Sequence, residues 1–277
     1  MPVSSACRTF IDLATQRSWQ DAVRTLNGLN MYEMLRALKV FEDADRAALR
    51  AAMASLGGAV NGPRIEYALT VVETSHLPAT APGDLASTGQ VQDARRFLRH
   101  PKCIFVETTP RGEIGLRNDG VSSSGNALMQ RLFGAPRDAY SQACQAVTNR
   151  TLAARIQTAS VGPFRATGLD SAVAALTAIM TQIQTRQRLV YRFLSSAGML
   201  CARNVRGSTT SVSNHSWGCA IDLKIDSVLD ARGDGVAQYG LELIAPMFND
   251  AGWYWGIDFP TEDAQHFEAG SALVQTW

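Results

Sequence analysis

The spacing of apolar residues changes along this chain, and that change is the strongest constraint on its fold. Up to about residue 76, apolar residues recur every three or four positions, and capping pairs such as Asn30 with Glu33 precede the apolar runs. Beyond Gly198, short runs of alternating apolar residues are separated by turns rich in Gly and Asp. The sequence therefore predicts an α+β protein, with a small antiparallel sheet and flanking helices after an all-helical N-terminal module.

Residues 77–90 mark the expected division between these two parts. The stretch is rich in Pro, Ala, Gly, Ser and Thr and has no regular apolar spacing, which is typical of a linker. We expect a helical module of unknown role, in delivery or docking, over 1–76. The second domain then spans 91–277, with its motif-bearing core at about 185–270.

One long helix is expected just before the change in spacing. Residues 171–197 keep a helical apolar pattern, Asp170 is a typical N-cap residue, and Gly198 follows at the position where helices commonly end. This pattern predicts a single main helix for the second domain.

Charge and apolar content exclude several functions. The chain has 26 basic and 25 acidic side chains with no long block of one sign, so we do not expect nucleic-acid binding. No window approaches about 18 uninterrupted apolar residues, so we expect no integral membrane contact. The N-terminus lacks the basic start and apolar run of a signal peptide. We therefore expect synthesis in the cytoplasm. The five cysteines are an odd number without a CxxC pair, which predicts buried thiols rather than disulfides or a thiolate zinc site.

Residues 213–226, SNHSWGCAIDLKID, place one of the four histidines shortly before an aspartate in an otherwise apolar run. From Cys219 onward, apolar and polar residues alternate, which predicts a half-buried strand with Asp222 on its open face. Gly218 allows the preceding turn to fold back, so that His215 can approach the Asp222 carboxylate. Such a pair is not specific alone, but its offset suits two ligands of one metal ion.

A metal ion needs a third ligand, and the remaining histidines are His76, His100 and His266. His266 lies in the acidic segment PTEDAQHFE. Two imidazole nitrogens and one carboxylate oxygen leave the fourth position of a tetrahedral zinc ion open to water, as in catalytic sites. In a tight turn Asp263 shares a side with His266, so it can act as the base, and Glu262 is the second choice.

Two segments together resemble a known family. SNHSWGCAID and the later EDAQHFE match the SxHxxGxAxD and (D/E)xxH motifs of zinc D-alanyl-D-alanine carboxypeptidases, a family that includes L-alanyl-D-glutamate endopeptidases of phage lysins and bacilli. The resemblance is clear over about 185–270, weaker over 110–185 and absent from the first ninety residues. It implies one Zn²⁺ per chain, bound by His215, Asp222 and His266, with Asp263 as catalytic base.

The resemblance also implies roles for pocket residues. An arginine before the first motif commonly polarises the scissile carbonyl or holds a substrate carboxylate, and both Arg203 and Arg206 stand in that region. The serine of the first motif, here Ser213, is expected to contact substrate. Trp217 is a further candidate for the pocket wall, although a tryptophan at such spacing is as often part of a core.

The implied activity is hydrolysis of peptidoglycan stem peptides by a zinc peptidase. Aspartate at position 263 is similar to the L-alanyl-D-glutamate endopeptidases, whereas carboxypeptidases tend to have glutamate there. The alternatives are a D-alanyl-D-alanine carboxypeptidase or dipeptidase using the same site, and a catalytically silent module that binds wall peptides. The intact base argues against the silent module.

The site of action is expected to differ from the site of synthesis. Peptidoglycan lies outside the cytoplasmic membrane, so a chain without a signal peptide must reach the cell wall or periplasm by release or injection. A phage lysin and an antibacterial effector both fit this requirement. The expected partners are stem peptides and, for an effector, a secretion apparatus or an immunity protein.

Overall fold

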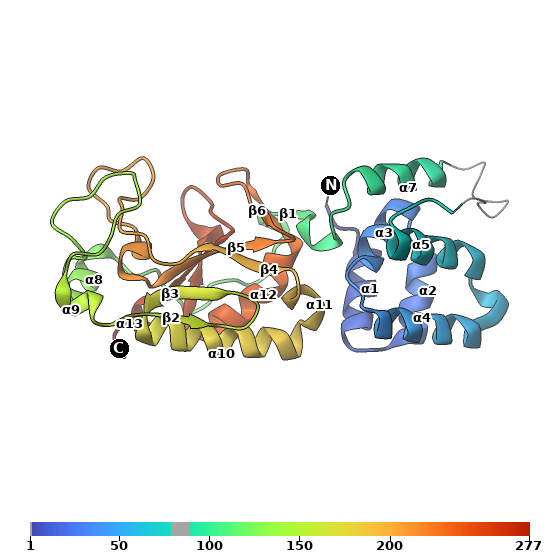
Figure 1. Cartoon of the computed structure of the whole chain (residues 1–277), viewed down its shortest axis with the longest axis horizontal. Helices are drawn as coiled ribbons and strands as arrows, with labels where there is room; N and C mark the ends of the chain where they lie inside the picture. The colour runs from blue at the N-terminus through green and yellow to red at the C-terminus, as the bar shows by residue number, and fades with distance from the viewer. Residues whose placement is uncertain (1, 79–88) are drawn as a thin grey trace. The chain divides into compact units, whose positions relative to one another are not determined.

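The structure of the protein is a computed structural model that describes residues 2–78 and 89–277. The chain divides into two compact units, residues 1–108 and 109–277. Figure 1 shows helices alone in the first unit, apart from the strand that begins at its end, and a mixture of strands and helices in the second.

The first unit is built from amphipathic helices around an apolar core. Asn30 and Glu33 form a reciprocal capping box at the start of a helix, as their spacing predicts, and Gly57 ends another helix at φ 53°. Phe10 and Phe41 meet edge to face in the core, with ring centroids 5.6 Å apart. The helical N-terminal part is thus confirmed. The elements are α1 (Ser5–Thr15), α2 (Trp19–Asn27), α3 (Met31–Leu38), α4 (Asp43–Leu56), η1 (Gly57–Ala59), α5 (Gly62–Thr74), α7 (Gln90–Arg99) and η2 (Ile104–Val106).

The division between the units lies later in the chain than the linker expected at 77–90. Most of that stretch, residues 79–88, lies outside the described residues. Helix α7 belongs to the first unit because Ala94 and Phe97 are buried, and because Arg96 stacks over the ring of Tyr32 in α3. The second unit accordingly begins near residue 109 rather than 91.

The second unit contains the antiparallel sheet that the sequence predicts. Its strand order is β4-β5-β9-β8, and β6 pairs with β5 beside this path. The strands of this sheet are β4 (Leu194–Gly198), β5 (Ala220–Ile225), β6 (Val228–Leu229), β8 (Trp253–Trp255) and β9 (His266–Ala269). Two further two-stranded sheets pair β2 (Ile156–Ser160) with β3 (Arg165–Leu169) and β1 (Thr108–Pro110) with β7 (Val236–Gln238).

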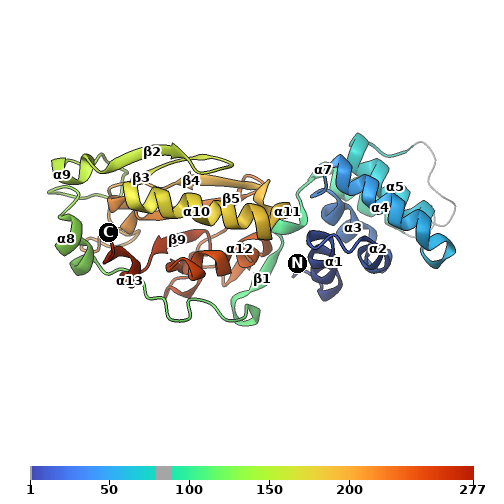
Figure 2. The same cartoon turned by 90° about the horizontal axis from the view of Figure 1, so that it is seen from below.

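Helices cover the strands of the second unit. Helix α10 (Asp170–Arg186) packs against β2 and β3 and contacts α12 (Tyr239–Asp250), as Figure 2 shows. In the core beneath α12, Phe248 and Phe267 stack with centroids 4.1 Å apart, and Trp255 lies parallel to Phe267. The remaining helical elements are η3 (Arg111–Glu113), α8 (Asn126–Phe133), α9 (Arg150–Ala153), α11 (Arg188–Tyr191), η4 (Asn214–Trp217), η5 (Gly256–Asp258) and α13 (Ser271–Val274). Within 2–78 and 89–277, no helix is both long and apolar enough to cross a membrane.

The helix expected over 171–197 is shorter in the structure. It ends at Arg186, the short helix α11 follows, and residues 194–198 form strand β4. Leu194 and Ser195 pair with Ile225 and Lys224 of β5, so backbone pairing at the edge of the sheet overrides the helical apolar pattern of this segment.

The cysteine expectation is wrong for two residues. Cys144 and Cys201 form a disulfide, with Cα atoms 5.1 Å apart, whereas Cys7, Cys103 and Cys219 are buried free thiols. The bonded pair is 57 residues apart in sequence, so spacing gives no sign that folding brings these two residues together.

Candidate metal centre

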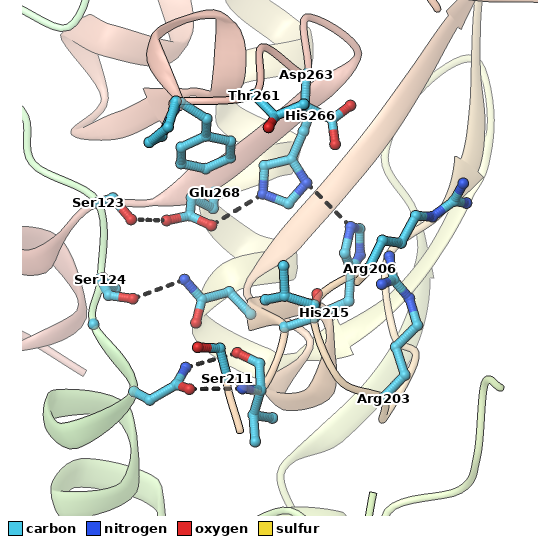
Figure 3. Close-up of a pocket in the computed structure, with 18 of the residues that line it drawn as sticks. Ser123, Ser124, Arg203, Arg206, Ser211, His215, Thr261, Asp263, His266 and Glu268 are labelled. Atoms are coloured by element: carbon cyan, nitrogen blue, oxygen red, sulfur yellow. Dashed lines mark hydrogen bonds and ion pairs between the residues drawn. The ribbon is translucent and has the colours of Figure 1, made fainter. Parts of the chain in front are cut away.

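Three side chains of the second unit converge on one point. The Nε2 atom of His215 lies 3.2 Å from the Oδ1 atom of Asp222 and 3.2 Å from the Nδ1 atom of His266. The Nδ1 atom of His266 lies 3.1 Å from the same Asp222 oxygen. Figure 3 shows the two imidazole rings facing each other across this point. The structure therefore selects His266, rather than His76 or His100 of the first unit, to complete the group.

The local fold explains this convergence. Asp222 and His266 are direct cross-strand partners on the antiparallel strands β5 and β9, so their side chains share one face of the sheet. His215 lies in the 3-10 turn η4, which ends at Gly218 with φ 67°, and the Gly218 N–H donates to the His215 carbonyl. The predicted strand alternation is confirmed, because Ile221, Leu223 and Ile225 are buried while Asp222 is half-buried.

In each histidine, one ring nitrogen (the outer one) faces away from the point of convergence and the other (the inner one) faces toward it. The hydrogen bond of the outer nitrogen determines which nitrogen of the neutral ring carries the proton. The Nδ1 atom of His215 lies 2.8 Å from the Met199 carbonyl, which can only accept, so this nitrogen carries the proton. The Nε2 atom of His266 likewise donates to the Glu268 carboxylate at 3.0 Å. In the neutral rings, both inward nitrogens then present lone pairs. With Asp222, three acceptor atoms face one another, and they require a cation between them.

The triangle of acceptor atoms has the dimensions of one face of a tetrahedral metal site, with three of its four ligand positions. Ligand atoms about 2.0–2.1 Å from a tetrahedral ion lie roughly 3.3 Å from one another. The three separations observed here are 3.1–3.2 Å. Since His215 and His266 are only 2% and 7% exposed, the rings are held in place before any ion binds. The residues present fit a divalent metal ion.

The pKa shifts of Asp222 and His266 also favour a positive charge between these side chains. Burial acts to raise the pKa of Asp222, but the charge and hydrogen bonds of the two histidines outweigh it and hold the pKa well below its usual range. Burial acts to lower the pKa of His266, and hydrogen bonds to Asp222 and Glu268 outweigh that effect and raise it to about 10. This raised pKa favours protonation of His266 when no metal ion is bound.

Glu268 is a functional residue that the motif comparison does not identify. It is buried, accepts from the His266 Nε2–H, and accepts at 2.5 Å from the hydroxyl of Ser123. Burial acts to raise the pKa of Glu268, but the hydrogen bond from His266 outweighs it and lowers the pKa, so the group stays ionised. The signal in the sequence is its position two residues after His266, on the same face of a strand.

A cavity of about 540 Å³ opens beside the three converging side chains. His215 and His266 form part of its wall, and Arg203, Arg206 and Asp263 line it as well (Figure 3). The cavity is large enough for several residues of a peptide.

Asp263 lies in this cavity with one oxygen free. Its backbone carbonyl accepts from the His266 N–H at 3.0 Å, which is the tight turn that the sequence predicts. Its Oδ2 atom pairs with the Nε atom of Arg232 at 3.4 Å, and its Oδ1 atom is buried without a hydrogen-bond partner among the described residues. Arg232, which the sequence analysis does not single out, also lines the cavity.

Glu262, the second choice for the base, has a different position. It is buried, and its two carboxylate oxygens accept from the backbone N–H groups of Ala264 and Gly235. It does not line the cavity. The structure thus places Asp263, and not Glu262, at the cavity beside the three converging side chains.

The two candidate arginines differ in how firmly they are held. Arg203 is half-buried, its Nη1 atom donates to the Asn204 carbonyl, and its backbone carbonyl accepts from the Ser213 N–H next to the η4 turn. Burial and the nearby charge of Arg206 lower the pKa of Arg203, although its guanidinium remains charged. Arg206 is exposed. Arg203 is therefore the better-ordered cation.

Ser213 and Trp217 have different surroundings. Ser213 is buried and lines the cavity, in a position to contact a substrate. Trp217 is fully buried, and its indole N–H donates to the Gly134 carbonyl at 2.8 Å. Trp217 is not a wall residue of the cavity, so the structure places it in the core instead of beside the substrate.

The disulfide joins two segments of the chain that lie next to the η4 turn, which carries His215. The Cys201 N–H donates to the His215 carbonyl at 2.9 Å, and Gln145, next to Cys144, pairs with Ala202 through two backbone hydrogen bonds. The Cys144–Cys201 bond therefore joins the loop around residue 144 to the segment that carries the Met199 carbonyl and Arg203.

Comparison with known proteins agrees with this geometry. The sequence model of a family described as D-alanyl-D-alanine carboxypeptidase matches residues 206–269, the segment that contains all three converging side chains and Asp263. The match supports a peptidase related to that family in this part of the second unit. No curated protein and no solved structure matches the chain significantly.

Proposed function

We propose that the protein is a zinc peptidase that cleaves peptidoglycan stem peptides, most specifically an L-alanyl-D-glutamate endopeptidase. The observation that carries this proposal is the set of three inward-facing acceptor atoms of His215, Asp222 and His266, beside a cavity that is also lined by Asp263. The family match over 206–269 supports the same reaction class.

Zinc is the metal that best suits these ligands. Two imidazoles and one carboxylate are typical of catalytic zinc sites, whereas calcium and magnesium prefer oxygen ligands alone. Glu268 orients His266 and increases its basicity, as carboxylates commonly do for zinc-binding histidines. When bound, zinc supplies Lewis acidity toward the scissile carbonyl and lowers the pKa of the attacking water.

Asp263 is the residue placed to move the proton. Its side chain lines the cavity, and its buried Oδ1 atom has no hydrogen-bond partner among the described residues, so this carboxylate is the group we assign to accept a proton from the attacking water. The same oxygen can then deliver that proton to the leaving amine. Arg232, paired with Oδ2, holds the carboxylate in one orientation before attack.

Arg203 is the better candidate for stabilising negative charge. It is half-buried, held by its neighbours, and lines the cavity with Arg206 and Arg232. Three guanidinium groups around one cavity suit a peptide that carries carboxylates. The D-glutamate of the stem peptide supplies one next to the proposed cleavage site, and the terminal D-alanine supplies one to a carboxypeptidase. The preference for the endopeptidase therefore rests on aspartate at position 263.

The cell-wall role follows from the substrate. The protein would act in the wall or periplasm, as a lysin or as an antibacterial effector, with the helical first unit serving in delivery or docking. For an effector, a secretion apparatus and an immunity protein would be its partners.

Digestion of purified muropeptides with a pentapeptide stem tests the proposal. We expect the wild type to release a peptide that begins with D-glutamate, whereas a D,D-carboxypeptidase would release free D-alanine. Asp263→Asn should keep its zinc and lose at least about 100-fold in cleavage rate, because the general base is gone. Asp138→Asn, which removes an exposed carboxylate of the same unit, should cleave like the wild type. Zinc binding without any cleavage by the wild type would instead indicate a silent binding module.

A further inference from the structure

A second group of acidic side chains lies behind the wall of the cavity. Asp230, Asp234 and Glu262 each place one carboxylate oxygen within 4.8 Å of the others. Asp230 and Glu262 are only 6% and 4% exposed, while Asp234 is exposed. None of the three lines the cavity, so this acidic cluster is distinct from the proposed zinc centre.

The loop over residues 230–235 is folded tightly around Glu262. It connects β6 to β7 and reverses direction through Gly233 and Gly235, at φ 82° and 78°. The Gly233 N–H donates to the Glu262 carbonyl, and the Gly235 N–H donates to its carboxylate. The cluster is therefore assembled by backbone geometry, and it is not a chance meeting of flexible side chains.

The buried carboxylate of Asp230 is incompletely satisfied. One oxygen accepts from the Gln238 N–H at 2.7 Å, but Oδ1 is buried and has no hydrogen-bond partner in the part of the chain that the structure describes. The side-chain oxygen of Gln238 is also buried there without a partner. A buried acceptor that is left unpaired costs about 1–3 kcal/mol. These oxygens are the kind of group that a bound cation satisfies.

The charges of the cluster are also unbalanced. None of its three carboxylates forms an ion pair with a described Lys, Arg or His, since the nearby Arg232 pairs with Asp263. Burial, together with the charges of Asp234 and Glu262, raises the pKa of Asp230 to about 7 against the effect of the Gln238 hydrogen bond. Either protonation of Asp230 or binding of a metal ion would reduce the negative charge of the cluster.

We propose that Asp230, Asp234 and Glu262 form a second metal site that binds calcium. All the ligands are oxygen atoms, which favours a hard divalent cation over zinc. Calcium accepts irregular coordination by six to eight oxygens, whereas magnesium demands a near-ideal octahedron. A folded loop with one exposed carboxylate suits calcium, because water can complete the coordination on the side of Asp234.

The site also has a consequence for the reaction, which rests on the proposed peptidase function. Arg232 lies within the calcium loop and Asp263 follows Glu262 directly, and both line the cavity. Calcium would hold these two segments together and so keep the proposed base in position. Asp230, Asp234 and Glu262 are thus positioning residues that do not touch the substrate.

Calorimetric titration of the zinc-loaded full-length chain with calcium chloride, in metal-depleted buffer, tests the site itself. We expect one calcium per chain with a Kd at or below about 1 mM. Asp230→Asn and Asp234→Asn should each weaken binding at least tenfold, whereas Asp138→Asn, an exposed aspartate away from the cluster, should not. Asp234→Asn changes an exposed side chain, so it remains informative if Asp230→Asn fails to fold.

Several results would overturn the site. Calcium binding that is absent in the wild type, or unchanged in both cluster variants, would mean that a proton alone balances the cluster. A second zinc ion in place of calcium would overturn the choice of metal.

Cleavage assays separate this inference from the proposed function. If the wild type cuts muropeptides, calcium removal should slow it at least threefold, and Asp234→Asn should lose this response while keeping its zinc. Calcium binding with an unchanged cleavage rate would contradict the positioning role. Absence of cleavage with or without calcium would contradict the peptidase and leave the binding result intact.

Discussion

At the scale of single residues, the proposed metal site depends on the groups behind its ligands. The Met199 carbonyl and the Glu268 carboxylate hold the outer nitrogens of His215 and His266, so both rings present lone pairs inward when they are neutral. A histidine without such a partner can rotate or change tautomer. Orientation by these acceptors is why the site is formed in the metal-free chain.

Glu268→Gln tests this support directly. The glutamine oxygen can still accept from the His266 Nε2–H, but the negative charge that makes His266 a stronger ligand is lost. We expect zinc affinity to fall about 10- to 100-fold in competition with a chromophoric chelator. Glu113→Gln, the same change at an exposed position, should bind zinc like the wild type. Equal affinity of the Glu268 variant would show that the carboxylate has no part in metal binding.

The sequence predicts some residues of this site and not others. His215, Asp222, Asp263 and His266 stand in two short motifs, and antiparallel pairing of β5 with β9 brings the two motifs together. Arg232 is different, because it reaches Asp263 only through a loop whose packing depends on Glu262. No local pattern encodes a contact of that kind.

At the scale of elements, the η4 turn that carries His215 packs closely against the backbone of strand β3. The Gly218 carbonyl accepts from the Leu169 N–H at 3.1 Å. A Cβ atom at Gly168 would lie 2.6 Å from the Gly218 carbonyl oxygen and 2.7 Å from the Met199 side chain. Both neighbours flank His215, so glycine at 168 allows β3 to support the metal site.

Gly168→Ala should therefore affect stability and metal binding together. We expect a loss of about 1–3 kcal/mol in the free energy of unfolding, measured in urea, because the added methyl group overpacks a buried contact. Zinc affinity should fall as well, since the displaced groups hold His215. Gly115→Ala, where the methyl group meets no atom within 4 Å, is the control and should change neither quantity. A variant as stable as the wild type would show that this contact adapts without cost.

The elements themselves were predictable where a local signal dominates. The alternation in β5 and the capping box of Asn30 and Glu33 both appear in the structure as the sequence predicts. Strand β4 was not predictable from its own residues, because Leu194–Gly198 continues a helical apolar pattern and becomes a strand only by pairing with β5.

At the scale of the whole molecule, the candidate site lies in one of the two units. The proposed zinc ligands, the proposed base, the cavity of about 540 Å³ and the acidic cluster all belong to residues 109–277. Composition indicates a helical first part but not that α7 belongs to it, because Ala94 and Phe97 reveal their partners only in the folded unit. The Cys144–Cys201 bond is equally a property of the folded chain.

The most direct test of the central claim is a zinc titration of the metal-free protein, with muropeptide cleavage as the readout and calcium held constant. If His215, Asp222 and His266 hold the catalytic zinc, cleavage should be absent without metal. It should then rise in proportion to added zinc and stop rising at one ion per chain. Cleavage by the metal-free protein at the full rate, or no cleavage at any zinc concentration, would contradict the assignment of this protein as a zinc peptidase.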